Sequence, residues 1–260
     1  MKKLLSRSLF APFLALGVAG LTLAQGTAPA ASAPQAPARP HSALEPVARA
    51  EDWWKARHDS IVARAKAGAD LVFLGDSITQ GWESEGKEAW AKHYGERHAL
   101  NAGISGDRTQ HVLWRLDHGL LDALASAERQ PKLALVMIGT NNSNGSDNAA
   151  EEISDGIVAI VERVRAKLPA TQVLLLAIFP RGVKPDAQRE KNARASALAA
   201  TALAGDKAVR ALDIGPKFLE PDGTLTPEVM PDLLHLSPRA YETWAASIAP
   251  ALDLLAPAQR

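Results

Sequence analysis

The chain has 260 residues, with 29 basic (Lys plus Arg) and 29 acidic side chains and no cysteine. The balanced charge argues against a broadly basic surface for nucleic acid, and the lack of cysteine excludes disulfides, thiolate catalysis and cysteine-ligated zinc. The seven histidines show no metal-binding spacing such as H-E-x-x-H, so we expect neither a metal nor another cofactor.

The N-terminal residues have the pattern of an export signal. Three basic residues precede an apolar run from Leu9 to Leu23, and small residues follow, which is typical of a secretory signal peptide cleaved after Ala24 or as late as Ala33. The alternative is a membrane anchor, but the run is short for a span and lacks a basic stop-transfer cluster. We predict a signal peptide over 1–24, an Ala/Pro-rich linker over 25–47, and a periplasmic or secreted protein without stable membrane insertion.

Residues 48–260 are expected to form a single α/β domain. Short apolar runs alternate with helical patterns, and the runs lack a period of two, which favours strands buried on both faces. This alternation predicts a parallel sheet of about five strands covered by helices on both faces, with a site beyond the carboxyl ends of the strands. The predicted strands are 69–75, 99–101, 132–138, 172–177 and 209–212, and the predicted helices are 48–66, 108–124, 149–168, 186–204 and 238–255.

Small or polar residues follow the first three predicted strands and precede the last helix. Ser77, Gly103 and Asn141 come after successive strands, and Asp232 and His235 stand before the final helix. A serine hydroxyl needs a base within hydrogen-bond reach to act as a nucleophile, and His235 can be that base. Asp232, three residues earlier, faces the same way in a helical or turn-like segment, where its carboxylate would fix the imidazole tautomer. The pattern predicts a Ser-His-Asp catalytic group.

Three of these residues are also candidate donors to an oxyanion. Ser77 opens a helix, so its backbone N–H points outward with the helix dipole behind it. Gly103 has no Cβ, so its N–H can come close to a substrate, and the Asn141 amide adds a third donor. Each residue has a structural alternative, with Asp76 as a helix cap, the glycine and asparagine in tight turns and His235 in the core. Their convergence at one predicted edge favours acyl transfer.

Several neighbouring residues have secondary roles in this hypothesis. Ser237 and Pro238 suit the N-cap and first position of the last helix, which would hold the preceding segment on a short, fixed approach to the sheet. Arg181, after the fourth strand, is a candidate for contact with a substrate oxygen or for a structural salt bridge. Trp53 and Trp54 are candidates for stacking on a sugar, although docking of their helix is the default role.

Together, these motifs resemble the SGNH/GDSL hydrolase superfamily, and within it the catalytic subunits of type Ib platelet-activating-factor acetylhydrolases. Its Ser, Gly, Asn and His match Ser77, Gly103, Asn141 and His235, with Asp232 in the D-x-x-H block. The resemblance covers about residues 51–255. It rests on the stretches 73–77, 101–116 (NAGISGDRTQHVLWRL), 138–142 (IGTNN), 179–185 (FPRGVKP) and 232–236 (DLLHL).

The resemblance implies a flavodoxin-like three-layer α/β/α sandwich, the SGNH hydrolase fold. It also implies metal-independent ester hydrolysis, often of acetyl groups, with Ser77, Gly103 and Asn141 as oxyanion-hole donors, and a homodimer. Three functions remain open at this point. The first is a short-chain esterase acting on acetylated carbohydrate or a similar small ester. The second is a lipid acetylhydrolase or lysophospholipase with the same mechanism. The third is a non-catalytic exported glycan-binding protein.

Overall fold

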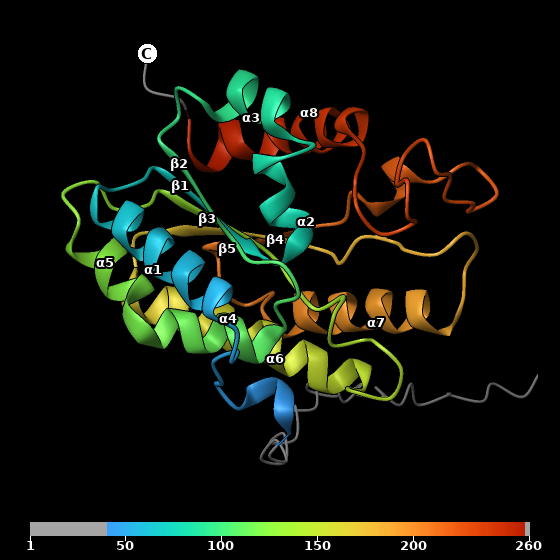
Figure 1. Cartoon of the computed structure of the whole chain (residues 1–260), viewed down its shortest axis with the longest axis horizontal. Coiled ribbons are helices and arrows are strands. Elements are labelled where there is room, and N and C mark those ends of the chain that lie inside the picture. Colours follow the sequence, from blue (N-terminus) through green and yellow to red (C-terminus); the bar gives the residue numbers. More distant parts are fainter. Residues whose placement is uncertain (1–40, 258–260) are drawn as a thin grey trace, which may run out of the picture. The chain divides into compact units, whose positions relative to one another are not determined.

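The computed structural model describes residues 41–257, and the predicted signal peptide and residues 25–40 lie outside the described residues. Five parallel strands form one sheet in the order β2-β1-β3-β4-β5 (Figure 1). The strands are β1 (Leu71–Gly75), β2 (Ala99–Gly103), β3 (Leu133–Met137), β4 (Gln172–Leu176) and β5 (Val209–Leu212). The predicted parallel sheet is confirmed, and each strand coincides with one of the apolar runs.

Strand β1 illustrates why these runs are apolar without alternation. Leu71 and Phe73 belong to the core on one face of the sheet, and Val72 and Leu74 belong to the core on the other. All four side chains are buried, because successive residues of a strand point to opposite faces and both faces are covered.

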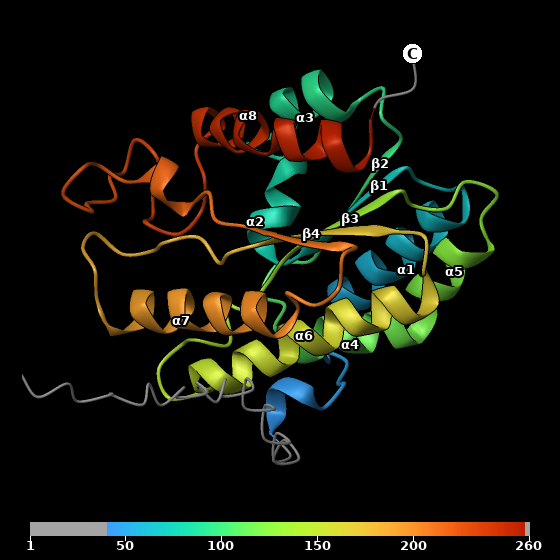
Figure 2. The same ribbon diagram turned by 180° about the vertical axis from the view of Figure 1, so that it is seen from behind.

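Helices lie on both faces of the sheet and complete three layers (Figures 1 and 2). One face is covered by α1 (Asp52–Lys66), α4 (Thr109–Arg115), α5 (Leu121–Ser126), α6 (Ala150–Lys167) and α7 (Ala187–Ala202). The other face is covered by α2 (Ser77–Gln80), α3 (Lys87–Tyr94) and α8 (Pro238–Leu255). The predicted α/β/α sandwich is therefore the observed architecture. Within residues 41–257, no helix has the length and apolar character needed to cross a bilayer.

The predicted helix over 108–124 is interrupted in the structure. A wider turn at Leu116–Leu120 separates α4 from α5, and His118 and Gly119 leave helical geometry there. Gly119 adopts a φ of 99°, a conformation that favours glycine, so the glycine inside the helical pattern marks the break. Helix α3 was not among the predicted helices.

Residues 41–51, which we call the N-terminal strap, pack against α4 and α6. A short 3₁₀ helix, η1 (Ser42–Leu44), buries Ala43, whose carbonyl oxygen accepts a 2.8 Å hydrogen bond from the Thr109 hydroxyl. Further along, the Val47 N–H donates to the Gln110 carbonyl at 3.3 Å. Residues 41–47, predicted as the end of a linker, are thus part of the compact domain.

Gly156 of α6 provides a test of this packing. A Cβ at this position would lie 2.6 Å from Thr109 Oγ1 and 2.8 Å from the Ala43 carbonyl oxygen. We expect Gly156→Ala to lower the Tm by a few degrees, because overpacking costs about 1–3 kcal/mol and exceeds the roughly 1 kcal/mol gained in helix propensity. Thermal unfolding followed by circular dichroism measures the change. Gly205→Ala, at a site with open space, is the matched control and should retain the wild-type Tm. Equal Tm values for both variants would contradict the tight contact.

Candidate active site

Ser77, His235 and Asp232 form a continuous hydrogen-bonded chain at the carboxyl edge of the sheet. Ser77 Oγ lies 2.9 Å from His235 Nε2, and His235 Nδ1 lies 2.6 Å from Asp232 Oδ2. Ser77 begins α2 directly after β1, whereas the other two residues stand just before α8. The fold brings together a hydroxyl, an imidazole and a carboxylate at distances that permit proton transfer.

The Asp232 side chain also organises the turn that carries His235. Its Oδ1 accepts the backbone N–H groups of Leu234 and His235, at 3.0 and 2.7 Å, which leaves Oδ2 for the imidazole. Partial burial acts to raise the pKa of Asp232, but the hydrogen bonds from His235 and Leu234 outweigh it and lower the pKa. Asp232 is therefore ionised at neutral pH.

Two further features fix the turn between β5 and α8. Leu233 has a φ of 61°, an uncommon conformation that persists only where surrounding contacts impose it, and its carbonyl accepts the Gly182 N–H at 2.9 Å. The predicted start of the last helix is confirmed, since Ser237 caps α8 by accepting the Ala240 N–H and Pro238 takes a first-turn position. His235 is thus held between a constrained turn and a capped helix.

The loop after β3 carries two adjacent asparagines with different contacts. Asn141 Nδ2 donates to the Asp107 carbonyl at 2.9 Å, which uses one of the two amide N–H groups. Asn142 is buried, accepts the Thr109 N–H at 2.9 Å and donates to Asn148 Oδ1 at 3.0 Å. Asn142 therefore ties the loop to α4, while Asn141 keeps one N–H for another partner.

Gly103 packs against α2, and its N–H is already engaged. The Gly103 N–H donates to Asn101 Oδ1 at 3.0 Å, and a Cβ on Gly103 would lie only 2.8 Å from the Asp76 carbonyl oxygen. The sequence predicts this N–H as an available oxyanion donor, but the Asn101 side chain already accepts it. The sequence signal for a different oxyanion donor is the glycine of Ser-Gly-Asp, Gly106. It has a φ of 76°. Its N–H donates to no other group within residues 41–257.

Helix α2 is a single turn of four residues, which limits the helix dipole expected behind Ser77. The Asp76 side chain caps this turn by accepting the Ile78 N–H at 3.0 Å. The role of helix cap predicted for Asp76 is confirmed. The Ser77 N–H makes no hydrogen bond in the part of the chain that the structure describes. The Ser77 N–H is therefore able to donate a directed hydrogen bond, whereas the dipole of so short a helix contributes little.

A buried ion pair supports the loop after β2. Arg115 of α4 is fully buried, and its Nη2 lies 2.8 Å from Asp107 Oδ2. The same guanidinium donates to the carbonyls of Ala102 at 2.8 Å and Gly75 at 3.4 Å, which are in β2 and β1. The Trp54 indole N–H donates to Asp107 Oδ1 at 2.6 Å, so Trp54 has the docking role expected by default. One guanidinium thus contacts the carboxyl ends of β1 and β2 and the loop that carries Asp107.

Arg181 lies on the rim of the site without a salt bridge in the described residues. Its Nη1 is 3.3 Å from Thr140 Oγ1 and 3.2 Å from Asn144 Oδ1. Burial lowers the pKa of Arg181, and the carboxylates of Asp186 and Asp232 act in the opposite direction. An arginine remains charged under these conditions, so Arg181 adds a fixed cation beside Asp232.

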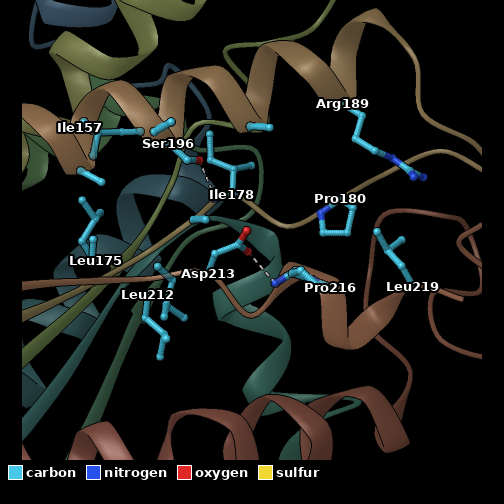
Figure 3. A pocket seen from close by; sticks show the side chains of 18 residues that line it. Ile157, Leu175, Ile178, Pro180, Arg189, Ser196, Leu212, Asp213, Pro216 and Leu219 are labelled. Atoms are coloured by element: carbon cyan, nitrogen blue, oxygen red, sulfur yellow. Dashed lines mark hydrogen bonds between the residues drawn. The ribbon is translucent and has the colours of Figure 1, made fainter. Parts of the chain in front are cut away.

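A cavity of about 390 Å³ lies elsewhere, between α7, the ends of β4 and β5, and the 3₁₀ helix η4 (Gly215–Phe218) (Figure 3). Its lining is mainly apolar and includes Ile178, Pro180 and Leu219, with the Asp213 carboxylate in the same view. None of the residues of the Ser77 chain lines it. The cavity is therefore separate from the hydrogen-bonded chain of Ser77, His235 and Asp232.

A parallel α/β sheet with a serine–histidine–aspartate group at its carboxyl edge defines the class of this protein, and comparison with known proteins defines the family. The profile of the GDSL-like Lipase/Acylhydrolase family matches residues 73–243. The alpha1 subunit of platelet-activating factor acetylhydrolase IB from Bos taurus is 41% identical over 189 residues, which is 72% of this chain and 77% of the relative. The chain belongs to the GDSL-like Lipase/Acylhydrolase family and is a hydrolase that acts on ester bonds.

Solved structures agree with this assignment. A GDSL-like lipase from Bacteroides thetaiotaomicron is 21% identical with a TM-score of 0.57, covering 76% of this chain and 97% of that one. A carbohydrate acetylesterase from Sinorhizobium meliloti is 25% identical with a TM-score of 0.54, covering 71% and 98%. The resemblance inferred from the motifs is confirmed. Because the family assignment makes the protein a hydrolase, the alternative of a non-catalytic glycan-binding protein is wrong.

The carboxyl group beside Ser77 leads to a prediction about stability. Asp76 is completely buried, and Oδ2 has no hydrogen-bond partner within residues 41–257. Burial raises the pKa of Asp76 to about 7, and the nearby Asp107 carboxylate adds to the rise. Since the folded state binds this proton more tightly than the unfolded state, Asp76 stabilises the fold at low pH. That contribution is lost as the pH rises toward 7.

We therefore expect Asp76→Asn, which keeps the oxygen that accepts the Ile78 N–H, to remove a pH-dependent loss of stability. Between pH 5 and pH 8 the Tm of wild type should fall relative to that of Asp76→Asn by several degrees, at roughly 2–4 °C per kcal/mol. Scanning calorimetry at several pH values measures this difference. Asp253→Asn, at an exposed position, is the control and should follow wild type. A constant Tm difference between Asp76→Asn and wild type would contradict the raised pKa.

Proposed function

We propose that this protein is a serine esterase that removes short acyl groups, acetyl in particular, from acetylated carbohydrates. The observation that carries the proposal is the chain of hydrogen bonds from Ser77 through His235 to Asp232, at 2.9 and 2.6 Å. A serine hydroxyl is a weak nucleophile unless a base is positioned to take its proton, and these distances supply that base.

In the proposed reaction, His235 Nε2 takes the Ser77 proton as Oγ attacks the ester carbonyl carbon. The tetrahedral intermediate collapses when the imidazolium gives its proton to the leaving alcohol, which leaves an acyl group on Ser77. Water, deprotonated by the same imidazole, then releases the carboxylic acid and restores the hydroxyl. The Asp232 carboxylate holds the ring in the required tautomer and stabilises the imidazolium in both steps.

We assign the developing oxyanion to three N–H donors: the Ser77 backbone, the Gly106 backbone and the Asn141 amide. Gly106 takes the place first given to Gly103, because the Gly103 N–H is bonded to Asn101. Two contacts support this assignment: Asn141 is bonded to the carbonyl of Asp107, the residue after Gly106, and the Ser105 N–H donates to Gln80 Oε1 of the Ser77 helix at 2.7 Å. Loss of one such donor typically lowers kcat by about 10²–10³.

The side chains around this edge favour a carbohydrate over a lipid. Arg181, Thr140 and Asn144 form one polar cluster, and Trp53 at the start of α1 leaves about 48% of its surface exposed. Polar groups and a half-exposed aromatic ring are suited to sugar recognition. The similarity to a carbohydrate acetylesterase from Sinorhizobium meliloti supports the same substrate.

The similarity to platelet-activating factor acetylhydrolase IB supports a lipid acetylhydrolase as the second candidate. The signal-like residues 1–24 support export, which would bring the enzyme to extracellular or periplasmic glycans.

The role of Ser77 can be tested with p-nitrophenyl acetate and the purified protein. Wild type should release p-nitrophenol, and Ser77→Ala should lower kcat by at least about 10³-fold, because a serine nucleophile has no substitute in the mechanism. Ser126→Ala, a change at the exposed end of α5 where the hydroxyl bonds its own helix, should retain wild-type kcat. Equal rates for wild type and Ser77→Ala would overturn the nucleophile assignment.

Substrate class is a separate prediction. We expect kcat/KM for acetate release from acetylated xylo-oligosaccharides to exceed that for an acetylated phospholipid, because the polar cluster of Arg181, Thr140 and Asn144 gives a sugar hydroxyl hydrogen-bond partners. Acetate can be quantified enzymatically for both substrates under the same conditions. Faster release from the phospholipid would favour the lipid acetylhydrolase.

A further inference from the structure

We propose that Arg49 of the N-terminal strap is a positioning residue, which holds the Ser105–Gly106 peptide so that the Gly106 N–H faces the oxyanion. The inference rests on the proposed esterase function. It concerns a side chain outside the four motif segments, contributed by a part of the chain that precedes the first strand.

Arg49 makes direct contact with the peptide in question. Its Nη1 donates to the Ser105 carbonyl oxygen at 2.9 Å, and this oxygen belongs to the same peptide unit as the Gly106 N–H. A Cβ placed on Gly106 would collide with Arg49 Nη1, so the absence of a side chain lets the guanidinium lie against this residue. A hydrogen bond from a charged donor is shorter and stronger than a neutral one.

The geometry of a peptide bond converts this contact into an orientation of the N–H. A trans peptide is planar, and its C=O and N–H point in opposite directions. A guanidinium that fixes the Ser105 carbonyl on one side therefore directs the Gly106 N–H to the other side. The same hydrogen bond polarises the peptide, which strengthens the N–H as a donor.

The neighbouring N–H groups of this loop have partners within the loop or in α2, whereas the Ser105–Gly106 peptide has its partner in the N-terminal strap. The Ser105 N–H is bonded to Gln80, and the Asp107 N–H donates to the Ile104 carbonyl at 3.1 Å. The peptide between them ends in a glycine, whose backbone has access to a wide range of φ. Within residues 41–257, the hydrogen bond from Arg49 is the one that this peptide unit itself makes.

Arg49 is itself held on several sides. Glu51 accepts from Nη2 at 2.5 Å and from Nε at 3.4 Å, and the guanidinium carbon lies 5.2 Å from the centroid of the Trp53 ring. These contacts fit the planar fork of an arginine, which can pair with a carboxylate and stack on an aromatic ring at once. A lysine at this position would keep the charge and one donor but lose the fork.

The test compares Arg49→Gln and Arg49→Lys with wild type and with Arg163→Gln. Arg163 forms a similar exposed ion pair with Asp117 at 3.1 Å and serves as the matched control. The measurements are kcat and KM for p-nitrophenyl acetate, with active sites counted by a p-nitrophenyl alkylphosphonate, and the second-order rate of phosphonylation. The phosphonate places an anionic oxygen where the oxyanion forms, so its rate reports donor alignment.

We expect Arg49→Gln to lower kcat per active site by about 10–100-fold, less than the loss of a whole donor, with KM within about 3-fold of wild type. Phosphonylation should slow in parallel, and Arg49→Lys should recover part of both rates. Arg163→Gln should match wild type. A purely structural role for Arg49 would lower the Tm and the number of active sites but leave kcat per active site unchanged, which would overturn the proposal.

A second variant and the wild-type rate separate a failure of folding from a failure of the proposal. If Arg49→Gln does not fold, Glu51→Gln replaces it. This change removes the carboxylate charge that pairs with the guanidinium and leaves the arginine itself unchanged. We expect a smaller fall in kcat per active site, and an unchanged value would overturn the proposal. Wild type that fails to hydrolyse p-nitrophenyl acetate would refute the proposed function itself. Active wild type, inactive Ser77→Ala and unaffected Arg49→Gln would refute the Arg49 role alone.

Discussion

The arrangement of this site depends on the buried ion pair between Arg115 and Asp107. The guanidinium bonds the carbonyls at the ends of β1 and β2 as well as the Asp107 carboxylate, and the Asp107 carbonyl in turn holds Asn141. A charge removed from water is costly unless every partner is present, and breaking such a pair costs about 3–5 kcal/mol. Few alternative positions of the loop would satisfy both charges, so the pair restricts the geometry at the carboxyl edge.

The sheet and the convergence of Ser77, Asp232 and His235 could be predicted because they follow from simple rules. Apolar runs alternating with helical patterns require a parallel sheet, and the carboxyl ends of parallel strands meet at one edge. The three-residue spacing from Asp232 to His235 favours their contact, and Ser237 with Pro238 marks the helix start that limits the turn. Each signal is local in sequence, so it could be interpreted without coordinates.

The remaining features could not be predicted because they depend on the side-chain rotamers, loop conformations and long-range contacts that the folded chain adopts. The engagement of the Gly103 N–H requires the side chain of Asn101 to turn back on its own strand, while the left-handed backbone of Gly106 is set by the loop as a whole. The packing of residues 41–47 was missed because an Ala- and Pro-rich composition resembles a linker. Nothing in the sequence near Arg49 indicates that its partner is the Ser105 carbonyl, 56 positions away.

The separation of 158 positions between Ser77 and His235 has a consequence for the order in which the protein becomes competent. Synthesis proceeds from the N-terminus, so the strap, all five strands and the Ser77 turn are synthesised before the imidazole of His235. The hydroxyl has no proton acceptor at hand until the final segment folds across the edge of the sheet. A polypeptide that ends before position 235 would lack the imidazole, so under the proposed mechanism hydrolysis begins only after the final segment has folded against the sheet.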